Sequence, residues 1–203
     1  MTFIDFHTHR PTAEGVATPR CFGIHPWLAP VDVDGYALPM ADEVDIVGEC
    51  GLDKCAHAPW ESQKELFAWH ISLAERWNKP MVIHCVRAFN ELIALRKNHR
   101  KIPWVVHGFM GGKELYEQLR AHGIGISLGK AVLDARRTKV RETLMSLRDE
   151  ELLLETDDSE VNIADIYRCV AELRGMNIVE LAAQIELNYS IIIGRSDAAR
   201  KQQ

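Results

Sequence analysis

The chain has 203 residues, 47% of them apolar, with 24 Lys and Arg against 29 Asp and Glu and a formal charge of -5. This length and apolar share predict one globular domain over residues 1–203, and the negative charge disfavours a surface devoted to nucleic acid. The sequence contains no run of roughly 20 apolar residues and begins without a secretory pattern, so we expect a cytoplasmic protein with no membrane partner.

Short apolar runs alternate along the chain with longer segments of helical spacing. This alternation favours an α/β fold with parallel strands. In chain order we expect strands at residues 3–6, 20–24, 44–47, 81–83, 104–106, 124–128 and 152–154. Helices are expected at 62–77, 112–122, 135–147, 163–174 and 178–192. The last helix is predicted to break near Asn188, residues 26–43 to form an irregular loop, and the polar tail 196–203 to fray.

His7 and His9 follow the first predicted strand in the string DFHTH. Successive side chains on a strand point to opposite faces, so the two imidazoles project in the same direction. Such an HxH pair is a common grip for a divalent metal, although alone it distinguishes poorly between a ligand pair and two surface histidines.

Four further metal-type residues come at the ends of other apolar runs: Glu49 in DIVGE, His84 in MVIH, His107 in WVVH and Asp157 in LLLETD. A single histidine at a strand end is more often a hydrogen-bonded structural residue. A parallel barrel, however, gathers the carboxyl ends of all its strands at one mouth. The repeated pattern therefore predicts that all six residues meet at a site for one or two divalent cations.

The mixture of imidazoles and carboxylates indicates a hydrolase. A bound cation lowers the pKa of coordinated water to about 7, and a carboxylate such as Glu49 can bridge two cations. Asp157 is the candidate base, because a carboxylate beside the activated water can take its proton and later protonate the leaving group.

The strings FIDFHTH, FGIHPW, GECGLD, MVIHC, VVHGFMGG and LLLETD, in this order, resemble the TatD family of the amidohydrolase superfamily. The resemblance implies a distorted TIM barrel, two divalent cations and hydrolysis of phosphodiester bonds in DNA or a nucleotide, as by a deoxyribonuclease. It assigns His7, His9 and Asp157 to one cation and His84 and His107 to the other, with Glu49 as the bridge and Asp157 as the base. The identity of the cations, among Zn, Mn, Mg, Fe and Ni, stays open.

One departure from the family pattern concerns the barrel itself. Only residues 10–22 separate the HxH pair from GIHPW, whereas the family usually places a helix, a strand and more there. The chain is expected to lack about one βα unit and to form an incomplete or differently closed barrel. Since an open edge leaves strand hydrogen bonds unpaired, we expect a compensating loop, a tighter barrel or a partner subunit, in a monomer or small homo-oligomer.

Other departures lie beside the expected site. Lys54 replaces the Tyr that commonly follows GLD, and Arg87 comes one position later than the usual Arg. Together with His25 of GIHPW, these residues are candidates for contacts with a substrate phosphate. An acidic stretch at 158–160 replaces a small apolar one and disfavours polyanionic substrates.

Three alternatives stay open. A hydrolase of the same superfamily acting on a small amide, lactone or phosphoester uses the same kind of site. A histidinol-phosphatase-like barrel also begins with HxH, but it generally needs more His and Asp ligands. The short segment and the extra acid also suit a catalytically weak metal-binding scaffold.

Overall fold

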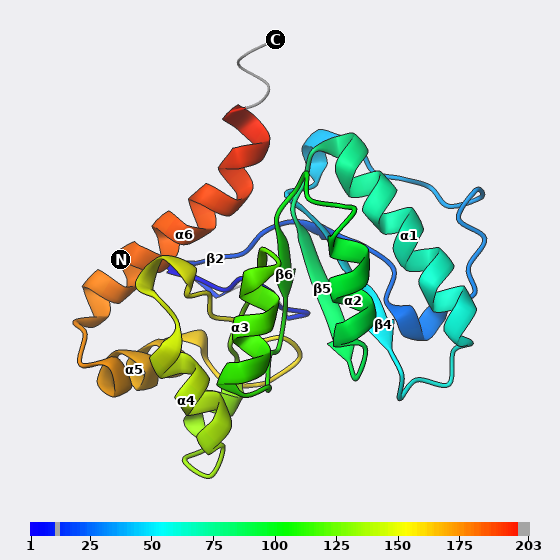
Figure 1. The fold of residues 1–203 in the computed structure, drawn as a ribbon. Coiled ribbons are helices and arrows are strands. Elements are labelled where there is room, and N and C mark those ends of the chain that lie inside the picture. The colour runs from blue at the N-terminus through cyan, green and yellow to red at the C-terminus, as the bar shows by residue number, and fades with distance from the viewer. Residues whose placement is uncertain (11–12, 199–203) are drawn as a thin grey trace.

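The protein has an α/β fold in which every strand pairing is parallel (Figure 1). The structure is a computed structural model that describes residues 1–10 and 13–198. One sheet has the order β3-β4-β5-β6-β7 and a second pairs β1 with β2. The strands are β1 Phe3–Ile4, β2 Val16–Ala17, β3 Cys21–Phe22, β4 Ile46–Asp53, β5 Met81–Val86, β6 Trp104–Val106 and β7 Ile124–Ile126.

The helices lie outside the strands, and Figure 1 shows α1, α2 and α3 following β4, β5 and β6 in turn. They are α1 Trp60–Trp77, α2 Phe89–Arg96, α3 Lys113–Ala121, α4 Thr138–Ser146, α5 Ile163–Arg174 and α6 Ile178–Ala198. Four short 3-10 turns complete the set, at Pro26–Leu28, Ala41–Glu43, Lys130–Leu133 and Asp149–Glu151. None of the helices in the described part of the chain is both long and apolar enough to span a membrane.

The short segment after the HxH pair joins the two sheets. Within residues 16–22, β2 pairs with β1 and β3 pairs with β4. This one extended segment therefore lies between β1 and β4 and pairs with both. On the far side, bridges from Leu128 to Leu154 and from Thr8 to Asp157 connect β7 through residues 154–157 back to the β1 end. The distorted barrel is thus confirmed, and the ring is tightened by a single crossing in place of a βα unit.

Several predicted boundaries were wrong. β4 runs on to Asp53, because Gly48 and Gly51 allow its backbone to pass close to β5, where a Cβ would lie 2.2 Å from the Val82 carbonyl and 2.0 Å from that of His84. Residues 152–154 form only the Leu154 bridge. The sequence also missed α2, which has only eight residues and buries just Leu92 and Arg96.

The predicted break near Asn188 is absent, and α6 continues to Ala198. Asn188 is 2% exposed, and its Nδ2 donates to the carbonyls of Asp149 and Leu152 at 2.7 and 2.9 Å. The amide therefore pairs across to another segment and leaves the helix intact. Of the tail expected to fray, residues 199–203 lie outside the described residues.

A small apolar cluster fills the inside of the ring. It takes one residue from each of five segments around the ring: Phe6, Ile46, Val82, Val105 and Leu153. Tyr189, Ile192 and Ile193 of α6 pack against this cluster. The larger cluster lies between the strands and the surrounding helices, and includes the Phe67, Ile71 and Ala74 stripe of α1. The inner cluster forms the floor beneath the carboxyl ends of the strands.

Candidate active site

Strand alternation places the candidate residues directly above this floor. Residues two apart on a strand face the same side, so His84 lies above Val82 on β5, and His107 lies above Val105 at the end of β6. In LLLETD the same period turns Leu153, Glu155 and Asp157 inward. The side chains converge because the two-residue alternation turns each of them inward and the ring brings the segments together.

Glu49 occupies the centre of the group. Its strand changes register against β5 between Val47 and Cys50, where the Gly48–Glu49 peptide is cis. The Glu49 side chain points inward within β4, where it is 7% exposed. The apolar run DIVGE predicted Glu49 at a strand end, and the structure places it mid-strand.

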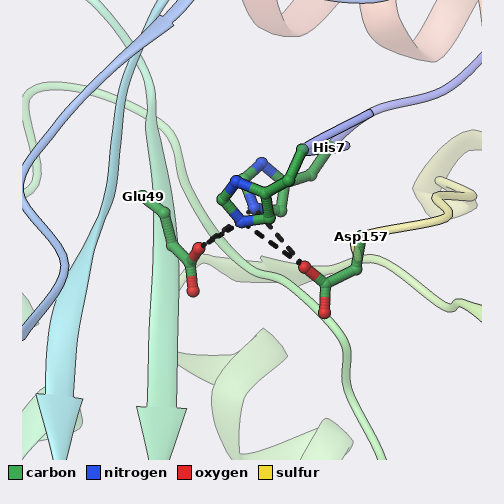
Figure 2. A group of neighbouring side chains, drawn as sticks. His7, Glu49 and Asp157 are labelled. Atoms are coloured by element: carbon green, nitrogen blue, oxygen red, sulfur yellow. Dashed lines mark hydrogen bonds and ion pairs between the residues drawn. The ribbon is translucent and has the colours of Figure 1, made fainter. Parts of the chain in front are cut away.

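One carboxylate oxygen of Glu49 faces the HxH pair. Oε2 lies 3.3 Å from His7 Nε2 and 2.9 Å from His9 Nε2. Asp157 Oδ1 lies 4.0 Å from His7 Nε2 and 3.6 Å from His9 Nε2. Figure 2 shows Glu49 and Asp157 approaching His7 from opposite sides. All four side chains offer donor atoms within 4.8 Å of one another.

The other Glu49 oxygen faces three further imidazoles. Oε1 lies 3.2 Å from His25 Nε2, 3.1 Å from His84 Nδ1 and 2.7 Å from His107 Nε2. His25, Glu49 and His84 form a second group whose donor atoms lie within 4.8 Å. The six residues predicted from strand ends thus lie together, and His25, expected only near the substrate, joins them.

Electrostatics in the group suit a cation. Burial raises the pKa of Glu49, but the hydrogen bonds from His107, His25, His7 and His84 outweigh burial and hold the pKa well below its usual range. Burial lowers the pKa of His107, but Glu155 and Glu49 outweigh it and raise the pKa to about 10. The carboxylates that retain a proton on His107 are equally suited to hold a divalent cation. The donor set therefore fits a metal-dependent hydrolase.

A cavity of about 1020 Å³ opens above the group. Of the two other residues predicted to contact a phosphate, Arg87 lines this cavity and Lys54 does not. Arg87, whose backbone φ is 55°, lines the cavity. Lys54 instead places its ammonium 2.5 Å from the Glu91 carboxylate and over the Trp60 ring. The structure thus directs Lys54 toward α2.

Two carboxylates that the sequence analysis did not assign hold the imidazoles from behind. Asp53 Oδ2 lies 3.1 Å from His84 Nε2, and Glu155 Oε1 lies 3.4 Å from His107 Nδ1. Glu155 is fully buried and also accepts from the Gly108 amide at 2.5 Å and from the Ser127 hydroxyl. Both residues belong to motifs of the family resemblance: Asp53 ends GECGLD, and Glu155 is the inward-facing Glu of LLLETD.

The acidic stretch beside the site is paired with cations. Asp158 lies 3.6 Å from the Lys130 ammonium, and Glu160 lies 3.5 Å from the Arg10 guanidinium. Arg10 also donates to the Asp158 carbonyl. Exposed pairs of this kind contribute little to stability. They do offset the negative charge of residues 158–160, which was predicted to disfavour a polyanionic substrate.

Comparison with known proteins identifies the family. Residues 13–194 match the model described as TatD related DNase. The chain belongs to the TatD family. It is 30% identical to the 3'-5' ssDNA/RNA exonuclease TatD of Escherichia fergusonii, over 88% of this chain and 80% of that protein. The Escherichia coli K12 protein of the same name is 29% identical over 85% of this chain and 76% of its own length.

Solved TatD structures support the same fold. The TatD homologue YjjV of Escherichia coli matches with a TM-score of 0.71 and 24% identity, over 89% of this chain and 77% of that one. A TatD family hydrolase from Entamoeba histolytica matches with a TM-score of 0.72 and 18% identity, over 87% and 74%. The prediction of a metal-dependent hydrolase of the TatD type is confirmed.

Proposed function

We propose that this TatD family member is a metal-dependent phosphodiesterase that removes nucleotides from the end of single-stranded DNA or RNA. The observation that carries the proposal is the convergence of five imidazoles on the two oxygens of Glu49, with Asp157 facing the HxH pair. The relatives named as 3'-5' ssDNA/RNA exonucleases support the substrate class.

The two groups around Glu49 would hold two divalent cations. His7, His9 and Asp157 would share one with Glu49 Oε2, whereas His84, His107 and His25 surround the side of Oε1. Bound there, the cations supply Lewis acidity to the phosphoryl oxygens and lower the pKa of water to about 7.

Asp157 is the residue suited to move the proton. Its carboxylate is 37% exposed, and burial raises its pKa above the ordinary value. The backbone fixes its position, because the Asp157 amide donates to the His7 carbonyl at 2.9 Å and the His9 amide donates to the Asp157 carbonyl at 3.1 Å. Asp157 accepts the proton of the attacking water and returns it to the leaving oxygen. Arg87 on the cavity wall provides a positive charge for a phosphate.

The test compares the wild-type protein with Glu49→Gln, which keeps the side-chain shape but loses the bridging charge. Substrates are a 5'-labelled single-stranded oligonucleotide and bis(p-nitrophenyl) phosphate, with Mg²⁺, Mn²⁺ or Zn²⁺ added. We expect Glu49→Gln to lose bound metal by elemental analysis and to slow hydrolysis of both substrates about 100-fold or more. The matched control is His122→Ala, which removes a half-buried histidine outside the cavity whose ring Nδ1 bonds to the Gln118 carbonyl of α3.

The outcomes separate the remaining alternatives. Cleavage of the small diester without cleavage of the oligonucleotide would indicate a small-phosphoester hydrolase. Metal binding with no turnover on either substrate would indicate a scaffold. Full activity of Glu49→Gln would contradict the proposed site.

A further inference from the structure

Trp27 combines exposure with a fixed position at the cavity. Its side chain is 62% exposed and lines the cavity beside the candidate metal ligands. Its Nε1 donates to Asp53 Oδ2 at 2.7 Å, and its ring meets His25 edge to face with centroids 4.6 Å apart. Asp53 already accepts a hydrogen bond from His84. Fixing the position of Asp53 therefore does not by itself require a large aromatic ring open to solvent.

The cavity that Trp27 lines also has apolar walls, in contrast to its charged floor. Leu28 and Met110 also line the cavity and are 65% and 62% exposed, and Phe89 and Phe109 contribute to the same walls. An inorganic phosphate bound at Glu49 would need only the charged floor. An apolar, aromatic wall above a site for phosphate suits a ligand that carries an anionic group and a flat ring together.

We propose that Trp27 is a stacking platform for the unpaired base next to the scissile phosphate. The proposal rests on the proposed function, since the phosphate must lie at Glu49. The His25 imidazole lies between Glu49 and the Trp27 ring. Its Nε2 is 3.2 Å from Glu49 Oε1, and its ring centroid is 4.6 Å from that of Trp27. In a nucleotide, one sugar ring spans the distance from phosphate to base.

The depth of the site favours an unpaired base. Glu49 lies at the floor with its side chain 7% exposed, so the terminal nucleotide must enter the cavity for its phosphate to reach the carboxylate. A base paired with a second strand would have to bring that strand in as well. Base stacking on an aromatic side chain is tolerant of base identity. Trp27 is therefore expected to bind any base and to favour a terminal nucleotide over an abasic residue.

The experiment uses the metal-loaded protein and two single-stranded oligonucleotides, one ending in a 3'-thymidine and one ending in a 3'-abasic residue. Rates are compared for wild-type protein, Trp27→Ala, Trp27→Phe and the control Tyr36→Ala. Tyr36 is a 44% exposed aromatic residue further along the same loop. Binding is measured separately by fluorescence anisotropy, with a phosphorothioate as the terminal linkage to slow cleavage.

For wild-type protein and Tyr36→Ala we expect a preference for the thymidine end of about 5- to 150-fold, the range that one stacked base provides. Trp27→Ala should bring this ratio close to one. Trp27→Phe should keep most of it, because Phe retains a ring but loses the N–H that reaches Asp53.

Two results would overturn the stacking role. An undiminished ratio in Trp27→Ala would show that the base lies elsewhere. Equal losses in Trp27→Phe and Trp27→Ala would show that Trp27 acts through Asp53 and His84. If no phosphodiester is cleaved by the wild-type protein, the proposed function fails, while the binding ratio still decides whether Trp27 recognises a base.

Discussion

Carboxylates behind two of the imidazoles determine which ring nitrogen faces the centre of the site, through a hydrogen bond at His84 and a charged contact at His107. His84 Nε2 donates to Asp53, so its Nδ1 is left to face Glu49 at 3.1 Å. His107 has the opposite arrangement, with Nδ1 toward Glu155 and Nε2 toward Glu49. Such partners fix the tautomer and raise the basicity of the ligand atom.

Asp53→Asn is therefore expected to weaken metal binding by about 10- to 100-fold, as loss of a carboxylate partner behind a ligand does elsewhere. The weakening follows because the amide can present an N–H to His84 and carries no charge. Metal affinity is measured by competition with a chromophoric chelator. Asp45→Asn, which removes a carboxylate paired with Arg20 outside the cavity, is the control and should bind metal as the wild type does. Equal affinities for Asp53→Asn and wild type would rule out this positioning role.

At this scale the sequence predicted the residues that meet but not the ones that orient them. His84, His107 and Asp157 could be found because each ends an apolar run, and strand alternation then fixes the side they face. Asp53 and Glu155 escaped because an acceptor for a second ring nitrogen needs only one oxygen at the right place, which leaves no periodic pattern. His25 precedes a 3-10 turn, and no strand period indicated its direction.

At the scale of elements, α1 holds the loop that carries His25. The Ile24 amide donates to His70 Nε2 at 2.9 Å, and His70 Nδ1 donates to the Leu66 carbonyl at 2.8 Å. The bond from Ile24 requires a neutral imidazole, because Nε2 must carry a free lone pair to accept it. Burial lowers the pKa of His70 from 6.5 to about 4, although the bond to Leu66 opposes this shift.

The His70 shift predicts a pH-dependent stability. The unfolded chain binds a proton at His70 more readily than the folded protein does, so the contribution is complete above pH 6.5 and is lost as the pH falls toward 4. The loss is on the order of 3 kcal/mol. Urea unfolding at pH 7 and pH 5 should show a smaller decrease for His70→Gln than for wild type, since glutamine does not titrate. Parallel decreases in the two proteins would contradict the assignment.

The continuity of α6 depends on a contact that the sequence could not indicate. A break was expected near Asn188, and Asn is a poor helix former, yet its amide donates to the Leu152 carbonyl in the segment leading to Asp157. A tertiary hydrogen bond outweighed the local propensity.

Asn188→Leu is expected to destabilise the protein by about 1–3 kcal/mol, because the buried Leu152 carbonyl loses its donor. The free energy of unfolding from urea titration measures this cost. Leu187→Ala, on the neighbouring exposed position of α6, is the control and should change stability far less. A stability equal to wild type would mean that Asn188 does not hold α6 to the barrel.

At the scale of the whole molecule, the ring forces residues from distant parts of the chain into one site. The sequence showed that about one βα unit is missing, and a tighter barrel was among the expected solutions. It did not show that β2 and β3 belong to one crossing, because Thr18 and Pro19 interrupt the apolar run. The two strands have only two residues each, and their partners β1 and β4 are not specified by local pattern.

With metal bound as proposed, this arrangement would couple metal binding to the stability of the entire fold. The candidate donors come from the β1 end, the loop before Pro26–Leu28, β4, β5, the end of β6 and the segment at Asp157, so a cation held among them would link strands around the ring. A ligand at about 100 times its Kd stabilises the folded state by about 2.7 kcal/mol. For a domain of this size that corresponds to a rise in Tm of roughly 5–10 °C.

Thermal unfolding of metal-loaded and EDTA-treated protein measures the coupling. We expect the rise in wild-type protein and in His122→Ala, and its loss in Glu49→Gln, because the two carboxylate oxygens of Glu49 face both groups of imidazoles. Equal Tm values for metal-loaded and EDTA-treated wild type would mean that no cation holds the strands together. A rise that persists in Glu49→Gln would place the cation away from the centre of the ring.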